Sequence, residues 1–216
     1  MTNYEKIKNF LETFSKTVDK DIETNLHEAS FDNNNAVYIY ENRKELNVLS
    51  MDVFAQQVYT KLRFLPKEIV GRMNINDLAV ATVDGFVIDK DNEWFFIEFK
   101  NTSSTSDNTK KSVVEKAYQN YSMLMSLFYE NKVKKPFCLF DFEQPMDFAK
   151  KHVTYILVVS EEKNYKDVAK LHGMAISGEK FRPEYMEKLR HYLFKDAYVY
   201  LPSDFEREFV NNFKYA

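Results

Sequence analysis

The chain has 216 residues, of which 44% are hydrophobic and 29% charged, and its net charge is −3. This length allows one large domain or one domain with an extension, and the slightly acidic balance excludes the strongly basic surface of proteins that coat nucleic acid. The single cysteine, Cys138, excludes an internal disulfide. The N-terminal residues lack a signal-peptide core, and no stretch reaches the roughly 18 apolar residues of a membrane span. We therefore expect a cytoplasmic protein with no membrane partner.

The first third of the chain predicts helices around a short extended segment, because apolar residues recur at helical spacing. The predicted elements are helices over 3–28 and 51–64, a turn-rich break at 31–35 and a short strand at 36–40. We interpret residues 1–50 as an N-terminal helical extension packed on the core, and 51–216 as one α/β domain.

The rest of the chain predicts a hairpin followed by a long helix and further strands. The predicted elements are a strand within 78–83, a hairpin over 83–100, a Ser- and Thr-rich loop over 101–108, a helix over 109–130, buried strands at 137–142 and 153–159, helices over 183–194 and 203–214, and an extended segment at 198–200. Both faces of the hairpin are apolar. The expected fold is therefore a mixed β-sheet flanked by helices on both faces.

The hairpin carries three charges on strands that are otherwise apolar: Asp84, Glu98 and Lys100. A three-residue turn at Lys90–Asn92, with Asn92 in the left-handed conformation, would place Asp84 opposite Glu98. Because side chains alternate along a strand, Lys100 would share their face. A two-residue turn would break this arrangement, so the prediction depends on the register.

Two carboxylates about 5 Å apart repel each other unless a cation lies between them. Carboxylate oxygens select a hard cation such as Mg²⁺ or Mn²⁺, which keeps several waters and takes further ligands from phosphate. Such a cation activates a bound water for hydrolysis, and a neighbouring lysine can orient that water. The hairpin therefore predicts a metal site that acts on a phosphodiester.

Asp84, thirteen intervening residues and then Glu98-Phe99-Lys100 at the end of an apolar strand resemble the signature of the PD-(D/E)xK nuclease superfamily. The resemblance implies a restriction-endonuclease-like core over about residues 51–160. It also implies that Asp84, Glu98 and the backbone carbonyl of Phe99 bind Mg²⁺ or Mn²⁺, and that Lys100 is the catalytic lysine.

Some features depart from that signature. The residue before Asp84 is Val83 rather than proline, and the Gln-x-x-x-Tyr motif of some members is not met, because Met123 stands four residues after Gln119. Two further Glu-x-Lys triplets, starting at Glu130 and Glu161, lack an apolar strand context. The alternative interpretation of the hairpin charges is a strand-end ion pair, because structural ion pairs form similar clusters.

The expected function is a metal-dependent nuclease that hydrolyses phosphodiester bonds of DNA, or of RNA. The sequence leaves the oligomeric state open, and the resemblance allows a homodimer, because many nucleases of this kind pair to cut two strands. Lys110 and Lys111 begin the helix after the hairpin and are the candidate nucleic-acid contacts, since a helix N-terminus also attracts phosphate. The alternative function is a catalytically inactive protein of the same fold that serves as a binding or interaction module, in keeping with the acidic balance of the chain.

Overall fold

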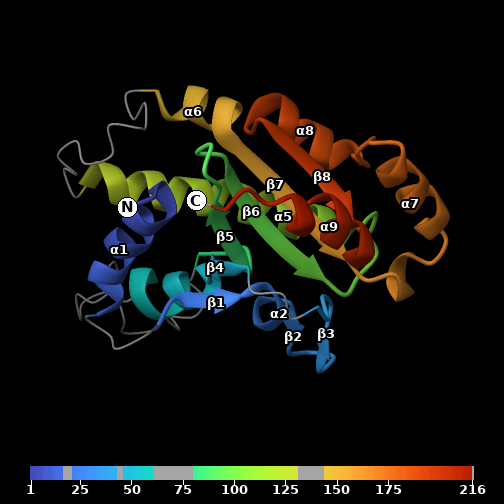
Figure 1. The fold of residues 1–216 in the computed structure, drawn as a ribbon, viewed down its shortest axis with the longest axis horizontal. Coiled ribbons are helices and arrows are strands. Elements are labelled where there is room, and N and C mark those ends of the chain that lie inside the picture. Colours follow the sequence, from blue (N-terminus) through green and yellow to red (C-terminus); the bar gives the residue numbers. More distant parts are fainter. Residues whose placement is uncertain (17–20, 43–45, 61–79, 131–143, 216) are drawn as a thin grey trace.

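The computed structural model describes residues 1–16, 21–42, 46–60, 80–130 and 144–215. In these residues the main sheet has six strands, and a separate two-stranded sheet lies near the end of β6 (Figure 1). The main sheet runs in the order β1 (Glu23–Asn25), β4 (Asn47–Leu49), β5 (Gly85–Ile88), β6 (Trp94–Lys100), β7 (Val153–Val159) and β8 (Asp196–Tyr200). The small sheet pairs β2 (Phe31–Asp32) with β3 (Val37–Tyr38).

The pairing of neighbouring strands changes from antiparallel to parallel at β6. From β1 to β6 each neighbouring pair is antiparallel, whereas β6 pairs with β7, and β7 with β8, in parallel. Parallel neighbours need a crossover connection, and the long helix α5 (Asp107–Glu130) lies between β6 and β7 in the chain. The predicted mixed sheet is therefore confirmed.

Helices cover both faces of the sheet. The remaining helices are α1 (Asn3–Ser15), α2 (Leu26–Ala29), α3 (Met51–Val53) with a π-helical continuation (Phe54–Tyr59), α6 (Pro145–His152), α7 (Val168–Ile176), α8 (Glu184–Tyr192) and α9 (Pro202–Glu208). One apolar core joins α1, α5, α6 and α8 to the face that carries Phe86 and Phe96. The second joins α2, α7 and α9 to the face that carries Val87 and Ile97. Alternation along β5 and β6 separates these two sets of residues, as the pleat requires.

The N-terminal residues differ from the prediction of one long helix over 3–28. Helix α1 begins with a capping box between Thr2 and Glu5 and ends at Ser15, and β1 and α2 follow. Ile22 is buried, but it lies in extended chain whose carbonyl accepts the Ser50 amide. An apolar residue at helical spacing was therefore misassigned, because it packs beside a strand. β1 and β4 also place part of residues 1–50 inside the main sheet, while the proposed boundary at residue 50 stays a prediction.

Other expectations have mixed outcomes. The strand at 153–159, the extended segment at 198–200 and the long helix are confirmed. The expected strand within 78–83 is wrong for residues 80–83, which have no strand assignment, and 137–142 lies outside the described residues. Helix α7 was not predicted. Among the described residues, no helix has the length and apolar character needed to cross a bilayer.

Candidate active site

The hairpin has the register on which the site prediction depends. Gly85 pairs with Ile97, and the Asp89 amide donates to the Glu93 carbonyl at 3.0 Å, so extending the ladder by one residue sets Asp84 opposite Glu98. Asn92 adopts the left-handed conformation, with φ of 63°. The three-residue turn is therefore confirmed, and β6 presents Glu98 and Lys100 on the face that α5 covers.

Asp84 lies just before β5, where the regular ladder between β5 and β6 ends. Its Oδ2 accepts the backbone N–H of Phe99 at 2.6 Å. Burial raises the pKa of Asp84 well above its usual range, and the neighbouring Glu98 raises it further, against the opposing effect of Lys116 and the Phe99 amide. Asp84 is thus a carboxylate whose negative charge is incompletely balanced by the protein.

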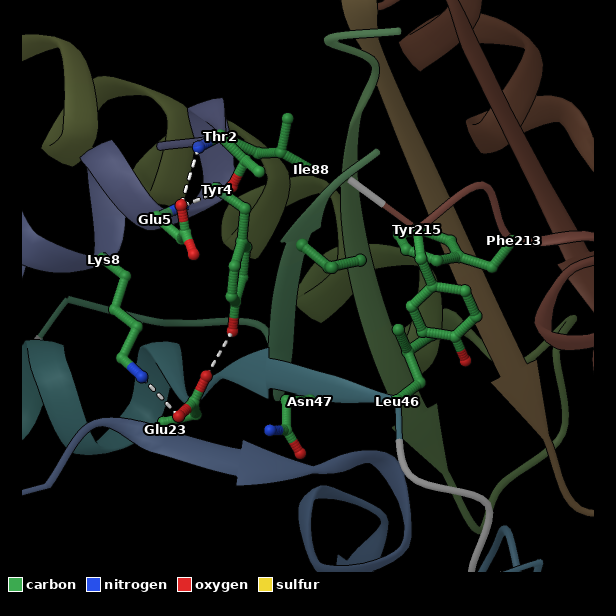
Figure 2. Close-up of a pocket in the computed structure, with 11 residues that line it drawn as sticks. Thr2, Tyr4, Glu5, Lys8, Glu23, Leu46, Asn47, Ile88, Phe213 and Tyr215 are labelled. Carbon is green, nitrogen blue, oxygen red and sulfur yellow. Dashed lines mark hydrogen bonds and ion pairs between the residues drawn. The ribbon is translucent and has the colours of Figure 1, made fainter. Parts of the chain in front are cut away.

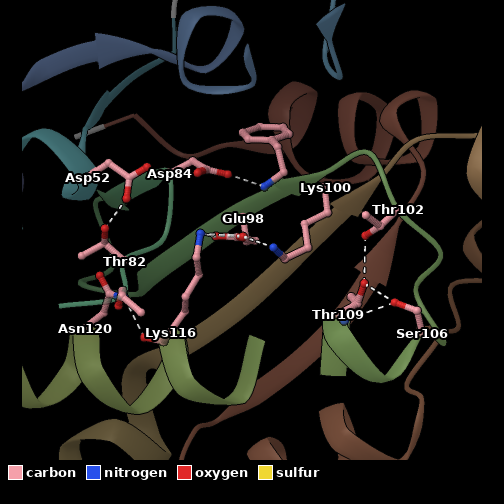
Figure 3. Close-up of polar contacts among 12 residues, drawn as sticks. Asp52, Thr82, Asp84, Glu98, Lys100, Thr102, Ser106, Thr109, Lys116 and Asn120 are labelled. Atoms are coloured by element: carbon pink, nitrogen blue, oxygen red, sulfur yellow. Dashed lines mark hydrogen bonds and ion pairs between the residues drawn. The ribbon is translucent and has the colours of Figure 1, made fainter. Parts of the chain in front are cut away.

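Glu98 is buried, with a side chain only 1% exposed, and two lysines reach it (Figure 3). Lys116 Nζ, from α5, lies 2.8 Å from Oε1 and 2.9 Å from Oε2. Lys100 Nζ, from the end of β6, lies 3.1 Å from Oε1. The structure therefore joins two predicted site residues, Glu98 and Lys100, to a lysine that was not predicted to belong to the site.

The segment leading into Asp84 is held from two sides. On α5, Gln119 Oε1 accepts the amide of Ala81 at 2.6 Å, and Asn120 Nδ2 donates to the Ala81 carbonyl at 3.1 Å. From α3, Asp52 Oδ1 accepts the hydroxyl of Thr82. Asp52 also acts electrostatically on both Asp84 and Lys116. These contacts fix the start of the hairpin against α5 and add a third acid to the site.

A pocket of about 290 Å³ opens over these groups. Its lining includes Asp84, Glu98, Phe99, Lys100 and Lys116. The opposite wall is the polar turn between β2 and β3, with the sequence Asp-Asn-Asn-Asn over residues 32–35. A turn from the first 50 residues therefore forms part of the pocket, which the sequence did not predict.

Lys110 and Lys111 lie near the start of α5 but do not line this pocket. Lys110 pairs with Asp107 at 3.0 Å, and Lys111 is exposed. Both line an open groove against α8 instead. Between them and β6, the loop at 101–106 is anchored by Asn164, whose amide group bonds the backbone of Thr102 and Ser104. The predicted loop is confirmed, and it holds α5 in place beside the end of β6.

A divalent cation fits these residues in its donor chemistry. Mg²⁺ is commonly held by one or two carboxylates, with water and phosphate completing the shell. Among the described residues no group of three or more His, Cys, Asp or Glu side chains is arranged to hold a metal, so the candidate ligands are the pair Asp84 and Glu98. Among the described residues the buried hydroxyl of Tyr155, on β7, has no hydrogen-bond partner, and both acids act on it electrostatically. A cation-bound water beside them would donate a hydrogen bond to this hydroxyl oxygen.

A second pocket, of about 410 Å³, lies on the other side of the sheet edge (Figure 2). Tyr4 from α1 projects into it and donates to Glu23 Oε1 at 3.1 Å, and Lys8 pairs with the second oxygen of Glu23. Phe213 and Tyr215 from the C-terminal residues form another wall. Its acid, Glu23, is already paired with Tyr4 and Lys8, which distinguishes this pocket from the acid-rich one.

Sequence reasoning missed Lys116 and Asp52. Lys116 stands between Val113 and Asn120 at spacings of three and four residues, on the side of α5 that faces the core. A lysine within a buried helical stripe was the available signal, because a buried cation needs a partner. Asp52 gave no comparable signal, since it follows Ser50 as an ordinary first-turn acid of a capped helix.

Comparison with known proteins adds no assignment, because no family model, no curated protein and no solved structure matches this chain.

Proposed function

We propose that this protein is a metal-dependent nuclease that hydrolyses phosphodiester bonds of DNA, or of RNA. The observation that carries the proposal is the hairpin register, which sets Asp84 opposite Glu98 and puts Lys100 on the same face, at the mouth of a pocket. Mg²⁺ or Mn²⁺ would be held by Asp84, Glu98 and the carbonyl of Phe99. The bound cation supplies Lewis-acid chemistry, lowering the pKa of a water and polarising the phosphodiester.

The residues of the chain have separate roles in this proposal. Lys100 is 20% exposed, so its ammonium reaches both Glu98 and the pocket, where it can orient the attacking water or balance developing charge. The amide-rich turn at residues 32–35 faces the same space and offers hydrogen-bond donors and acceptors to a nucleic-acid backbone. Lys110 and Lys111 extend positive charge along α5 beyond the pocket.

The order of elements supports a restriction-endonuclease-like core as part of the proposal. Antiparallel β4, β5 and β6 are followed by α5, and β7 then joins parallel to β6. The sheet thus holds three antiparallel strands and a parallel strand that follows a helix, as the sequence signature implies, although along the chain α3 stands between β4 and β5, and α6 between α5 and β7. The candidate site lies at the end of β6.

The test is cleavage of plasmid DNA, single-stranded DNA and RNA with Mg²⁺ or Mn²⁺. The wild type is expected to cleave at least one of these substrates, and a chelator is expected to stop the cleavage. Glu98→Gln keeps the size of the side chain and is expected to abolish cleavage. The matched purification control is Lys163→Met, because Lys163 pairs with the exposed Glu162 at 2.9 Å. Equal cleavage by wild type and Glu98→Gln would contradict the proposal.

One observation favours the second candidate, a catalytically inactive nuclease-fold protein that acts as a binding module. Lys100 and Lys116 together already neutralise Glu98, at 3.1 Å and 2.8 Å. In that case the lysines replace the cation permanently. Calorimetric titration with Mn²⁺ separates the two candidates. An inactive protein shows no binding, whereas a nuclease binds Mn²⁺ as wild type and does not bind it as Glu98→Gln.

A further inference from the structure

Lys116 makes the closest cationic contact in the candidate site. Its ammonium bridges both oxygens of Glu98, at 2.8 and 2.9 Å, and its side chain is 17% exposed. Lys100 contacts one oxygen, at 3.1 Å. Three acids, Asp52, Asp84 and Glu98, all act electrostatically on Lys116. Lys116 thus occupies the position that a cation shared by these acids would take.

The backbone of α5 leaves Lys116 little freedom to lie elsewhere. Val113 and Ala117, on either side of it, are fully buried in the core. Four residues later, Asn120 donates to the Lys116 carbonyl at 2.6 Å and to the Ala81 carbonyl at 3.1 Å, which fastens this turn of α5 to the segment before Asp84. The helix backbone is therefore fixed beside Glu98, and only the flexible end of the Lys116 side chain can move.

We propose that Lys116 is the resident counter-ion of this site, holding Glu98 in the metal-free protein and competing with a divalent cation for that carboxylate. The inference rests on the proposed function only in giving Glu98 a metal-binding role. A buried carboxylate without a cation is destabilising, and Lys116 removes that penalty before metal arrives. The cation must then displace Lys116 from Glu98, which lowers metal affinity and leaves the lysine free to meet an anionic phosphate.

The decisive variant is Lys116→Met, which keeps the length and apolar stem of the side chain while removing its charge. Without metal, its melting temperature is expected to fall by about 5–10 °C, because Glu98 loses its closest partner. Its affinity for Mn²⁺, measured by calorimetry, is expected to rise about tenfold or more, since the competing cation is gone. Mn²⁺ should then raise its melting temperature more than that of the wild type.

Lys188→Met is the matched control, because Lys188 also pairs with a glutamate, at 2.7 Å, but on the exposed surface. Lys188→Met is expected to leave the melting temperature and the affinity for Mn²⁺ unchanged. If Lys116→Met folds too poorly to titrate, the double variant Lys116→Met with Glu98→Gln removes both charges together. The double variant is expected to recover the lost melting temperature and to bind no Mn²⁺.

Equal Mn²⁺ affinity and equal melting temperature in Lys116→Met and wild type would overturn the inference, and so would a double variant no more stable than Lys116→Met. These outcomes are distinct from failure of the proposed function. A wild type that cleaves no nucleic acid, together with a Lys116→Met variant that gains Mn²⁺ affinity, would contradict the nuclease and leave the counter-ion role standing.

Discussion

Glu98 and Asp196 are both strand carboxylates that contact two cationic side chains, yet their surroundings differ. Asp196, at the start of β8, accepts Arg182 Nε at 2.9 Å and Lys180 Nζ at 3.1 Å, together with the Ala197 amide. Although partial burial raises the pKa of Asp196, Arg182 and Lys180 outweigh it and hold the pKa below the ordinary aspartate value. Glu187 also acts electrostatically on Arg182, so two acids and two cations meet here.

The Glu98 cluster has an excess of acids. Asp52, Asp84 and Glu98 all act electrostatically on Lys116, Lys100 contacts Glu98, and the pKa of Asp84 is raised rather than lowered. At Asp196 the cations match the acids in number, and the pKa of the carboxyl is lowered. Surplus acid at the mouth of a pocket instead leaves room for a further cation. The comparison therefore separates a strand-end ion pair from a candidate ligand site by counting charges around each acid.

Asp84→Asn tests the functional side of this comparison and has the largest expected effect. The substitution removes a candidate metal ligand, so cleavage should fall at least about 100-fold. Its melting temperature without metal should stay level or rise, because a carboxylate with a raised pKa is removed. A steady-state cleavage assay measures the loss of activity, and a thermal melt measures the change in melting temperature. Unchanged cleavage would show that Asp84 is structural, like Asp196.

Asp196→Asn tests whether the ion pairs of Asp196 stabilise the folded protein. It leaves Arg182 and Lys180 without their shared charge, and the loss of charge-assisted hydrogen bonds is expected to cost about 1–3 kcal/mol of unfolding free energy. Urea unfolding measures this cost. Cleavage per folded molecule should equal that of the wild type, so a large loss of cleavage would mean that the two clusters are coupled.

The pH dependence of stability should carry the signature of Asp196. A carboxyl whose pKa is lowered in the folded protein contributes stability that is fully present above its unfolded value, 3.8, and is lost as pH falls through the folded value. Melting temperatures between pH 6 and pH 3 should therefore fall less steeply in Asp196→Asn than in the wild type. Parallel curves for the two proteins would contradict this assignment.

Asn92→Ala tests whether the turn maintains the register that the acid pair needs. Asn92 is left-handed, and its side-chain oxygen accepts the amide of Asn3 at 3.0 Å. Alanine in this conformation costs about 1–2 kcal/mol, which urea unfolding can measure. Asn92→Gly relieves the backbone cost and serves as the control. An alanine variant as stable as the glycine variant would show that the left-handed residue does not matter.

Lys111→Ala has the smallest expected effect and probes the surface around the site. Loss of one exposed phosphate contact should weaken nucleic-acid binding only a few-fold and reduce the slope of log affinity against log salt by about 1. Fluorescence anisotropy at several salt concentrations measures both. Lys170→Ala, exposed on α7, is the control. Identical slopes in both variants and wild type would remove Lys111 from the proposed interface.

Short-range patterns in the sequence were enough to predict the hairpin. The near-continuous apolar runs of β5 and β6 mark the two strands, and the three-residue turn with Asn92 sets the register and therefore the face of Glu98 and Lys100. These features act between residues close in the chain, so periodicity and turn chemistry report them directly.

Contacts between distant segments were not predictable in the same way. Lys116 reaches Glu98 across the packing of α5 on the sheet, and its neighbours alone do not specify that partner. β1 is a short polar strand, Glu-Thr-Asn, that pairs with β4 from beyond a separate hairpin, so no apolar alternation marks it. The pocket wall at residues 32–35 depends on that same long-range pairing.

The hydrogen bonds that Gln119 and Asn120 of α5 make to Ala81 link the folding of the hairpin to the docking of α5. The hairpin is local in sequence, and its register alone would bring Asp84 and Glu98 together without Lys116 beside them. Docking of α5 then supplies Lys116 and, through Asn120, fastens the start of the hairpin in the same step. The repulsion within the hairpin is thus relieved only on helix docking, which makes the hairpin and α5 one cooperative unit whose opening exposes the acids together.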